Sequence, residues 1–499
     1  MREYRTRRPR AMLIAITVAG GLLLTGCGGG ASDRSGKSDG SALFPAPAYS
    51  SGRNDSRENT NHLSTFALDV DTASYGYARR VLSEGRLPEP STVRPEEFVN
   101  SFRQDYERPH GNGFTVTVDG ARTGQEGWSL VRVGLATRAA PPEGERPPAA
   151  LTFVIDVSGS MGEPGRLDLV RDSLGVLTER LRDDDSIAIV TFSDGARTVL
   201  PMTRLGDHRA RIHDAIGELR PTASTNLGAG VRTGYATAVE GLRPGATNRV
   251  VLLSDGLANT GDTDADTILE RIANARREHG ITLFGVGVGS EYGDALMERL
   301  ADRGDGHTTY VSSDDDARTV FSEQLPQNVE LTARDAKAQV AFDPQTVAEF
   351  RLIGYDDRRV ADQDFRDDRV DGGEVGPGHT VTALYAVRTR PDASGHLATA
   401  SVRWLDPATR DPHEESGQLE TGALEDDLWH SSYGLQVAAT AAYFADNLRL
   451  GRRWAPLPGR PGLSALADRA DTLAERTQDA DVRGLAKAIQ EASDLRGAE

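Results

Sequence analysis

Short apolar runs rich in β-branched residues recur through the middle of the chain, at residues 151–155, 187–190, 250–253 and 281–288. Each run has the length and composition of a β-strand that is buried on both faces, as in a parallel sheet. Between the runs, apolar side chains recur at helical spacings of three and four, for example at Leu167, Val170 and Leu174. Strands that alternate with helices predict an α/β domain with a doubly wound, mostly parallel sheet.

Side chains with oxygen donors gather where these predicted strands end. Asp156, Ser158 and Ser160 follow the first run, Asp255 follows the third, and Thr225 lies in a loop before another helical segment. Ligands of open α/β sheets bind at the carboxyl ends of the strands, so these side chains are expected at one edge. Two carboxylates and three hydroxyls, with no histidine or thiolate, favour a hard cation. We expect Mg²⁺, with Mn²⁺ or Ca²⁺ as alternatives.

The Asp-x-Ser-x-Ser pattern at Asp156, Ser158 and Ser160, followed in order by Thr225 and Asp255, resembles the metal-ion-dependent adhesion site of the von Willebrand type A domain. The resemblance implies that the two serines and Thr225 contact the metal, whereas Asp156 and Asp255 act largely through bound water. It also implies an open coordination position for a carboxylate of a protein partner. The expected function is therefore divalent-metal-dependent binding of a protein ligand.

Segments on both sides of this domain have a different pattern. Residues 114–118 and 128–136 alternate as strands before it, and residues 347–355 and 378–385 read as strands after it. We expect these strands to pair into one β-rich body, with the metal domain as an insertion. Amphipathic segments after residue 430 predict a helical C-terminus, whose small-residue stripe at Leu435, Ala438 and Ala442 favours a core role over a partner-binding face.

The flanks resemble those of a bacterial family of von Willebrand-type lipoproteins. In that family the metal domain lies between an N-terminal von Willebrand-associated segment and a C-terminal domain of unknown function. The predicted organisation is a signal peptide over residues 1–26, a flexible tether over 27–60, the N-terminal segment over 61–145, the type A domain over 148–326, and a β-rich then helical domain over 327–499.

The N-terminus predicts export and lipid attachment. Five arginines precede an apolar run at residues 11–24, which is shorter than the ~20 residues of a membrane-spanning helix and typical of a secretory leader. The sequence Leu24-Thr25-Gly26-Cys27 resembles the lipobox of bacterial lipoproteins. The resemblance implies that Cys27, the only cysteine of the chain, carries a lipid. We therefore expect a protein anchored to the cell membrane on its extracytoplasmic face.

Several other functions are disfavoured by the sequence. A net charge of −18 and the lack of a basic patch outside the leader argue against nucleic-acid binding. The glycine-rich residues 285–290 resemble a nucleotide-binding loop, but Ser290 replaces the last glycine, so a strand end is the better interpretation. No nucleophile elbow or zinc signature occurs, and we expect no catalytic residues and no enzyme activity.

Two alternatives stay open. One is an envelope scaffold in which the metal site is structural. The other is a metal-assisted hydrolase, for which Glu163 or Asp262 would be candidate bases beside the cation. Asp69 and Asp71 also resemble the start of a metal motif, but they lack the paired serines and are interpreted as turn and capping carboxylates.

Overall fold

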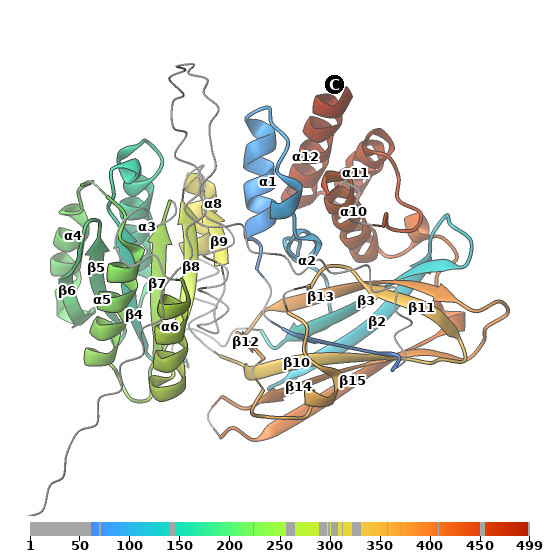
Figure 1. Ribbon diagram of the computed structural model, residues 1–499, viewed down its shortest axis with the longest axis horizontal. Helices are drawn as coiled ribbons and strands as arrows, with labels where there is room; N and C mark the ends of the chain where they lie inside the picture. Colours follow the sequence, from blue (N-terminus) through green and yellow to red (C-terminus); the bar gives the residue numbers. More distant parts are fainter. Residues whose placement is uncertain are drawn as a thin grey trace, which may run out of the picture. The chain divides into compact units, whose positions relative to one another are not determined.

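The computed structural model describes residues 61–497 except for 69–70, 140–145, 223, 256–264, 289–296, 298–299, 301–307, 312, 322–330, 357, 371, 408 and 450–454. The predicted leader, the tether and Cys27 lie outside the described residues. In the described part the strands form a six-stranded, a five-stranded and a four-stranded sheet (Figure 1).

The six-stranded sheet has the order β6-β5-β4-β7-β8-β9. Its strands are β4 (Ala149–Asp156), β5 (Ser186–Phe192), β6 (Ala196–Arg204), β7 (Thr247–Ser254), β8 (Thr282–Val288) and β9 (Thr308–Val311). All neighbouring strands are parallel except β5 and β6. The prediction of a mostly parallel sheet is therefore confirmed. Residues 285–288 lie in β8, as the strand interpretation required, whereas Gly289 and Ser290 lie outside the described residues.

Helices cover both faces of this sheet (Figure 1). One face carries α3 (Leu167–Arg180), α4 (Arg209–Gly217) and α8 (Asp314–Thr319), and the other carries α5 (Leu227–Glu240) and α6 (Ala265–His279). Phe153 and Ile155 of β4 pack with α3, while Val154 between them packs with α5. Because successive side chains of a strand point to opposite faces, a strand covered on both sides has a continuous apolar run.

The flanking segments form two antiparallel sheets around one core. One has the order β1-β10-β14-β15, with β12 paired to β10, and the other has the order β11-β13-β3-β2. The strands are β1 (Leu63–Ala67), β2 (Phe114–Arg122), β3 (Trp128–Thr137), β10 (Ala333–Phe342), β11 (Val347–Leu352), β12 (Gly373–Val375), β13 (Thr380–Thr389), β14 (His396–Leu405) and β15 (Pro412–Glu420).

Strands from before and after the inserted domain pair directly. β1 is antiparallel to β10 and β3 is antiparallel to β13, so each sheet joins segments that are separated by more than 180 residues of sequence. The expectation of one β-rich body interrupted by the type A domain is confirmed. Each of the two sheets therefore contains strands from both flanks, joined through the β1–β10 and β3–β13 pairs.

The remaining helices pack together and against one face of the four-stranded sheet, in a single core. They are α1 (Ala73–Ser83), α2 (Pro95–Asn100), α10 (Tyr433–Leu448), α11 (Leu463–Thr477) and α12 (Ala480–Gly497). Leu435, Ala438 and Ala442 of α10 are fully buried, which confirms the predicted core role of this stripe. Among the described residues, no helix combines the length and hydropathy that a membrane crossing requires.

Short 3₁₀ turns are η1 (Pro90–Thr92), η2 (Ser160–Gly162), η3 (Gly206–His208), η5 (Asp362–Asp364), η6 (Thr421–Ala423) and η7 (Leu428–His430).

Asp71, just before α1, has a larger role than the turn or capping function expected of it. Its Oδ1 accepts a 2.5 Å hydrogen bond from the backbone N–H of Thr308 at the start of β9. Its Oδ2 accepts a 2.8 Å hydrogen bond from Arg358, and both side chains are buried. One carboxylate thus contacts both the six-stranded sheet and the β-rich body. Asp69 lies outside the described residues.

Candidate metal-binding site

Asp156 is the last residue of β4 and is fully buried. Its Oδ1 accepts a 2.8 Å hydrogen bond from the backbone N–H of Ser158, and its Oδ2 accepts a 2.6 Å hydrogen bond from the Ser254 hydroxyl. Burial raises the pKa of Asp156 to about 6, while the hydrogen bonds from Ser254 and Ser158 act in the opposite direction. The two bonds fix the orientation of the carboxylate at the end of the strand.

A chain of hydrogen bonds joins three more of the predicted residues. The Ser158 and Ser160 hydroxyls lie 3.1 Å apart. The Ser160 hydroxyl donates to Oδ1 of Asp255 at 3.0 Å. Asp255 follows β7, which is the neighbour of β4 in the sheet, so the hydrogen bond from Ser160 to Asp255 links the ends of two adjacent strands. The structure therefore brings Asp156, Ser158, Ser160 and Asp255 together at one sheet edge.

The loop that carries Thr225 is attached to the same edge on both sides. Thr222 donates its backbone N–H to the carbonyl of Val157 at 2.6 Å, and Asn226 donates its backbone N–H to the carbonyl of Ser193 at 2.7 Å. The Asn226 side chain then caps α5 by accepting from the backbone N–H of Ala229 at 3.0 Å. Thr225 itself is buried between these two anchor points.

Arg166 is a member of this cluster that sequence reasoning did not identify. Its Nη1 lies 2.5 Å from Oδ2 of Asp255 and also donates to the carbonyl of Ser160 at 3.1 Å. Its Nη2 lies 2.7 Å from Oε2 of Glu163, which is largely exposed. The guanidinium is buried together with Asp255. The only signal in the sequence was a single basic residue in the loop that follows the Asp-x-Ser-x-Ser pattern.

The donor set fits a hard divalent cation. All side-chain donors of Asp156, Ser158, Ser160, Thr225 and Asp255 are oxygens, which suits Mg²⁺, Mn²⁺ or Ca²⁺. Only two of the donors are carboxylates, which suits Mg²⁺, because it keeps waters and uses few protein carboxylates. In the described part of the chain there is no group of three or more histidine, cysteine, aspartate or glutamate side chains placed to hold a metal.

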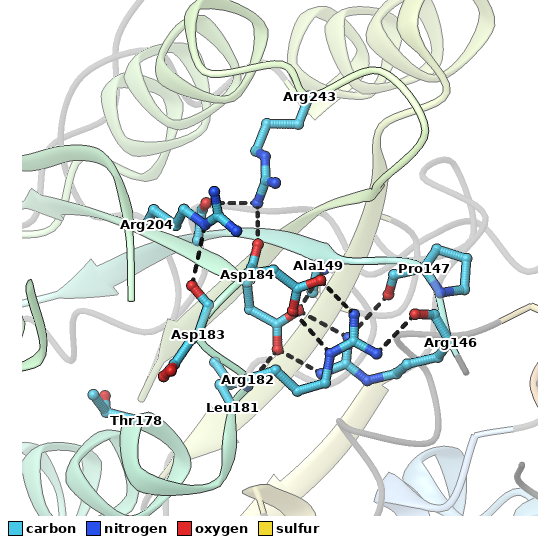
Figure 2. A network of polar contacts seen from close by, with 12 residues as sticks. Arg146, Pro147, Ala149, Thr178, Leu181, Arg182, Asp183, Asp184, Arg204 and Arg243 are labelled. Carbon is cyan, nitrogen blue, oxygen red and sulfur yellow. Dashed lines mark hydrogen bonds and ion pairs between the residues drawn. The ribbon is translucent and has the colours of Figure 1, made fainter. Parts of the chain in front are cut away.

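A second polar network lies at the opposite edge of the sheet, where β4 and β5 begin (Figure 2). Arg146 donates to both carboxylate oxygens of Asp185, at 2.8 and 2.5 Å. The backbone N–H groups of Ala149 and Arg182 donate to the same carboxylate, which is fully buried. Four donors from this chain already surround Asp185. The network therefore fastens the loop before β5 to the start of β4 and is not a candidate binding site.

Three stretches of the chain match known families. Residues 49–131 match a family described as von Willebrand factor, residues 150–323 match the von Willebrand factor type A domain, and residues 328–456 match the C-terminal region of the uncharacterized protein YfbK.

Individual proteins are similar over different lengths. The uncharacterized protein YfbK of Escherichia coli strain K12 is 35% identical over 415 residues, which cover 78% of this chain and 71% of that protein. Inter-alpha-trypsin inhibitor heavy chain H3 of Rattus norvegicus is 29% identical over 180 residues, 34% of this chain and 20% of that protein. Among solved structures, a von Willebrand factor type A protein from Catenulispora acidiphila aligns with 80% of this chain and 89% of its own, at 16% identity and a TM-score of 0.43. The chain belongs to the bacterial von Willebrand factor type A family that includes YfbK.

Proposed function

We propose that this protein binds a protein partner through a divalent cation at the sheet edge formed by the ends of β4 and β7, with Mg²⁺ as the favoured ion. The observation that carries the proposal is the continuous set of hydrogen bonds from Ser254 to Asp156 and from Ser158 through Ser160 to Asp255. This arrangement holds oxygen donors from two adjacent strands in fixed positions, as a preorganised ion site requires.

Ser158, Ser160 and Thr225 would hold the cation directly, and Asp156 and Asp255 would act through bound water. When bound, the cation supplies the positive charge that a carboxylate of the partner coordinates. The chain's own residues orient the donors: Ser254 holds Asp156, and Ser160 holds Asp255. Direct ligands that are neutral hydroxyls leave the cation more attractive to an incoming anion than charged ligands would.

We place the protein on the extracytoplasmic face of the cell membrane, anchored through a lipid on Cys27. This part of the proposal is supported by the leader and the lipobox-like sequence at residues 24–27. About 30 residues of polar, glycine- and serine-rich chain follow Cys27, and a flexible coil of that length has a root-mean-square reach of roughly 30 Å. The folded part would then be displayed clear of the lipid headgroups.

Binding is favoured over hydrolysis because one of the two candidate bases, Glu163, is engaged in an ion pair with Arg166. The Ser160 hydroxyl donates to Asp255. The second candidate base, Asp262, lies outside the described residues. The envelope-scaffold alternative differs in one respect: the metal would steady the fold, and partner binding would not depend on it.

Capture of envelope proteins on the immobilised full chain separates these alternatives. We expect a partner to be retained in Mg²⁺, released by a chelator, recovered when Mg²⁺ is restored, and absent with Asp156→Ala. Asp172→Ala, on an exposed position of α3, is the matched control and should behave as the unaltered chain does. Partner binding that persists in the chelator and with Asp156→Ala would favour the envelope scaffold and overturn metal-dependent binding.

A further inference from the structure

Arg166 places a positive charge directly beside the proposed cation site. Its guanidinium is buried at the end of the loop that follows Ser160, directly against a carboxylate of the donor set. A buried guanidinium is costly to desolvate unless it is paired and hydrogen-bonded. Here it is both, because it contacts Asp255, the carbonyl of Ser160 and Glu163.

Both carboxylate oxygens of Asp255 are contacted by the chain's own groups. Oδ1 accepts from the Ser160 hydroxyl, and Oδ2 pairs with Arg166. A buried carboxylate without a counter-ion would be strongly unfavourable. Arg166 removes that penalty without any bound ion. Asp156 is stabilised differently, by neutral donors from Ser158 and Ser254.

We infer that Arg166 is a resident counter-cation of this site, which keeps the site folded without metal and competes with a divalent cation for Asp255. The metal-binding half of this inference rests on the proposed function, and the stability half does not. Like charges repel strongly at short range in a partly dehydrated site, so the guanidinium lowers the affinity for a dication. The metal would then be a reversible ligand and not a structural element of the fold.

Arg166 also bears on the charge of the metal-bound site. Two ionised aspartates cancel the charge of a dication, and Glu163 opposes the charge of Arg166 from 2.7 Å. The named groups then leave no net negative charge that would repel an anionic partner group from the open coordination position. Arg166 thus tunes metal affinity without being a metal ligand.

Two substitutions of Arg166 separate charge from hydrogen bonding. Arg166→Gln keeps an N–H donor but removes the charge, and Arg166→Lys keeps the charge. Arg171→Gln, in α3 shortly after Arg166, is the control, since Nη1 of Arg171 donates to the carbonyl of Leu219 and not to the site. The thermal unfolding midpoint of each full-length variant is measured in chelator and in Mn²⁺, and Mn²⁺ affinity is measured by electron paramagnetic resonance.

In chelator, Arg166→Gln should lower the unfolding midpoint by about 5 °C, and Mn²⁺ should restore it, while Arg166→Lys and Arg171→Gln stay near the unaltered chain. Mn²⁺ should bind Arg166→Gln about tenfold more tightly. An unchanged midpoint in chelator, or Mn²⁺ affinity equal to or weaker than that of the unaltered chain, would overturn the inference. If the unaltered chain binds no Mn²⁺, the proposed function fails, yet a midpoint lowered by Arg166→Gln and not by Arg166→Lys would still uphold the counter-cation.

Discussion

The Ser254 hydroxyl donates a 2.6 Å hydrogen bond to Oδ2 of Asp156 and so joins the carboxyl ends of β7 and β4. Both residues are buried, and Asp156 is the first residue of the Asp-x-Ser-x-Ser pattern. The orientation of one proposed site carboxylate therefore depends on a residue that is not itself a proposed ligand.

Replacing Ser254 by alanine tests this dependence. Ser254→Ala removes a donor from a buried carboxylate, so the free energy of unfolding in chelator should fall by about 1–3 kcal/mol. Mn²⁺ affinity should weaken several-fold, because only the hydrogen bond from the backbone N–H of Ser158 then orients Asp156. Urea unfolding and Mn²⁺ titration measure the two effects. Ser173→Ala is the control, since this buried hydroxyl donates within α3 to the carbonyl of Leu169. Equal Mn²⁺ affinities of the two variants would contradict the positioning role.

Gly234 allows α5 to lie close against β4. A Cβ atom at this position would be 2.3 Å from Cγ2 of Val154, so Gly234→Ala must push the helix away from the sheet. We expect a loss of about 1–3 kcal/mol in the free energy of unfolding. Since α5 begins directly after Thr225 and Asn226, metal affinity should fall as well. Gly175→Ala in α3, where a Cβ meets nothing within 4 Å, should leave both quantities unchanged or raise stability slightly. Unaltered metal affinity in Gly234→Ala would show that the helix position does not control the site.

Asp71 is expected to stabilise the docking of β9 and of the segment around Arg358. Asp71→Asn leaves Arg358 buried without its full counter-charge, so the free energy of unfolding should fall by about 3 kcal/mol. Urea unfolding of the full chain measures the change, with Asp471→Asn at an exposed position of α11 as control. A stability equal to that of the control would mean that the buried pair contributes nothing.

Lipid attachment has a direct chemical test. Cells that express the full chain and are fed labelled palmitate should incorporate label into the protein, and Cys27→Ala should abolish both the label and membrane association. Because Cys27 is the only cysteine, no other thiol can account for incorporation. Label that persists in Cys27→Ala, or an unlabelled native chain, would contradict the proposed anchor.

The sequence predicted β4, β5, β7 and β8 of the six-stranded sheet, because each of them contains a continuous apolar run. β4 and β7 are covered on both faces, so their apolar runs were visible without any structure. β6 was missed because it is the antiparallel edge strand and buries only two of its nine residues, which breaks the apolar run. The pairing of the two flanks was predicted from the strand pattern of both. That β1 pairs with β10 and β3 with β13 could not be predicted, because the inserted domain separates these partners in the sequence.

Ion pairs between residues far apart in the sequence could not be predicted from the sequence. Ser158 and Ser160 are neighbours along the chain, so their pattern could be recognised. Arg166 and Asp255 are 89 residues apart, and Asp71 and Arg358 are 287 apart. A single arginine or aspartate among many gives no local periodicity, and only the fold shows which of them are buried together.

Calorimetric titration of the full chain with Mg²⁺ and with Mn²⁺, beside Asp156→Ala and the control Asp172→Ala, measures whether the ends of β4 and β7 bind a divalent cation. We expect binding at a single site in the unaltered chain and in Asp172→Ala, and none in Asp156→Ala. Absence of binding in the unaltered chain, or equal binding by Asp156→Ala, would contradict a functional metal site at the ends of β4 and β7.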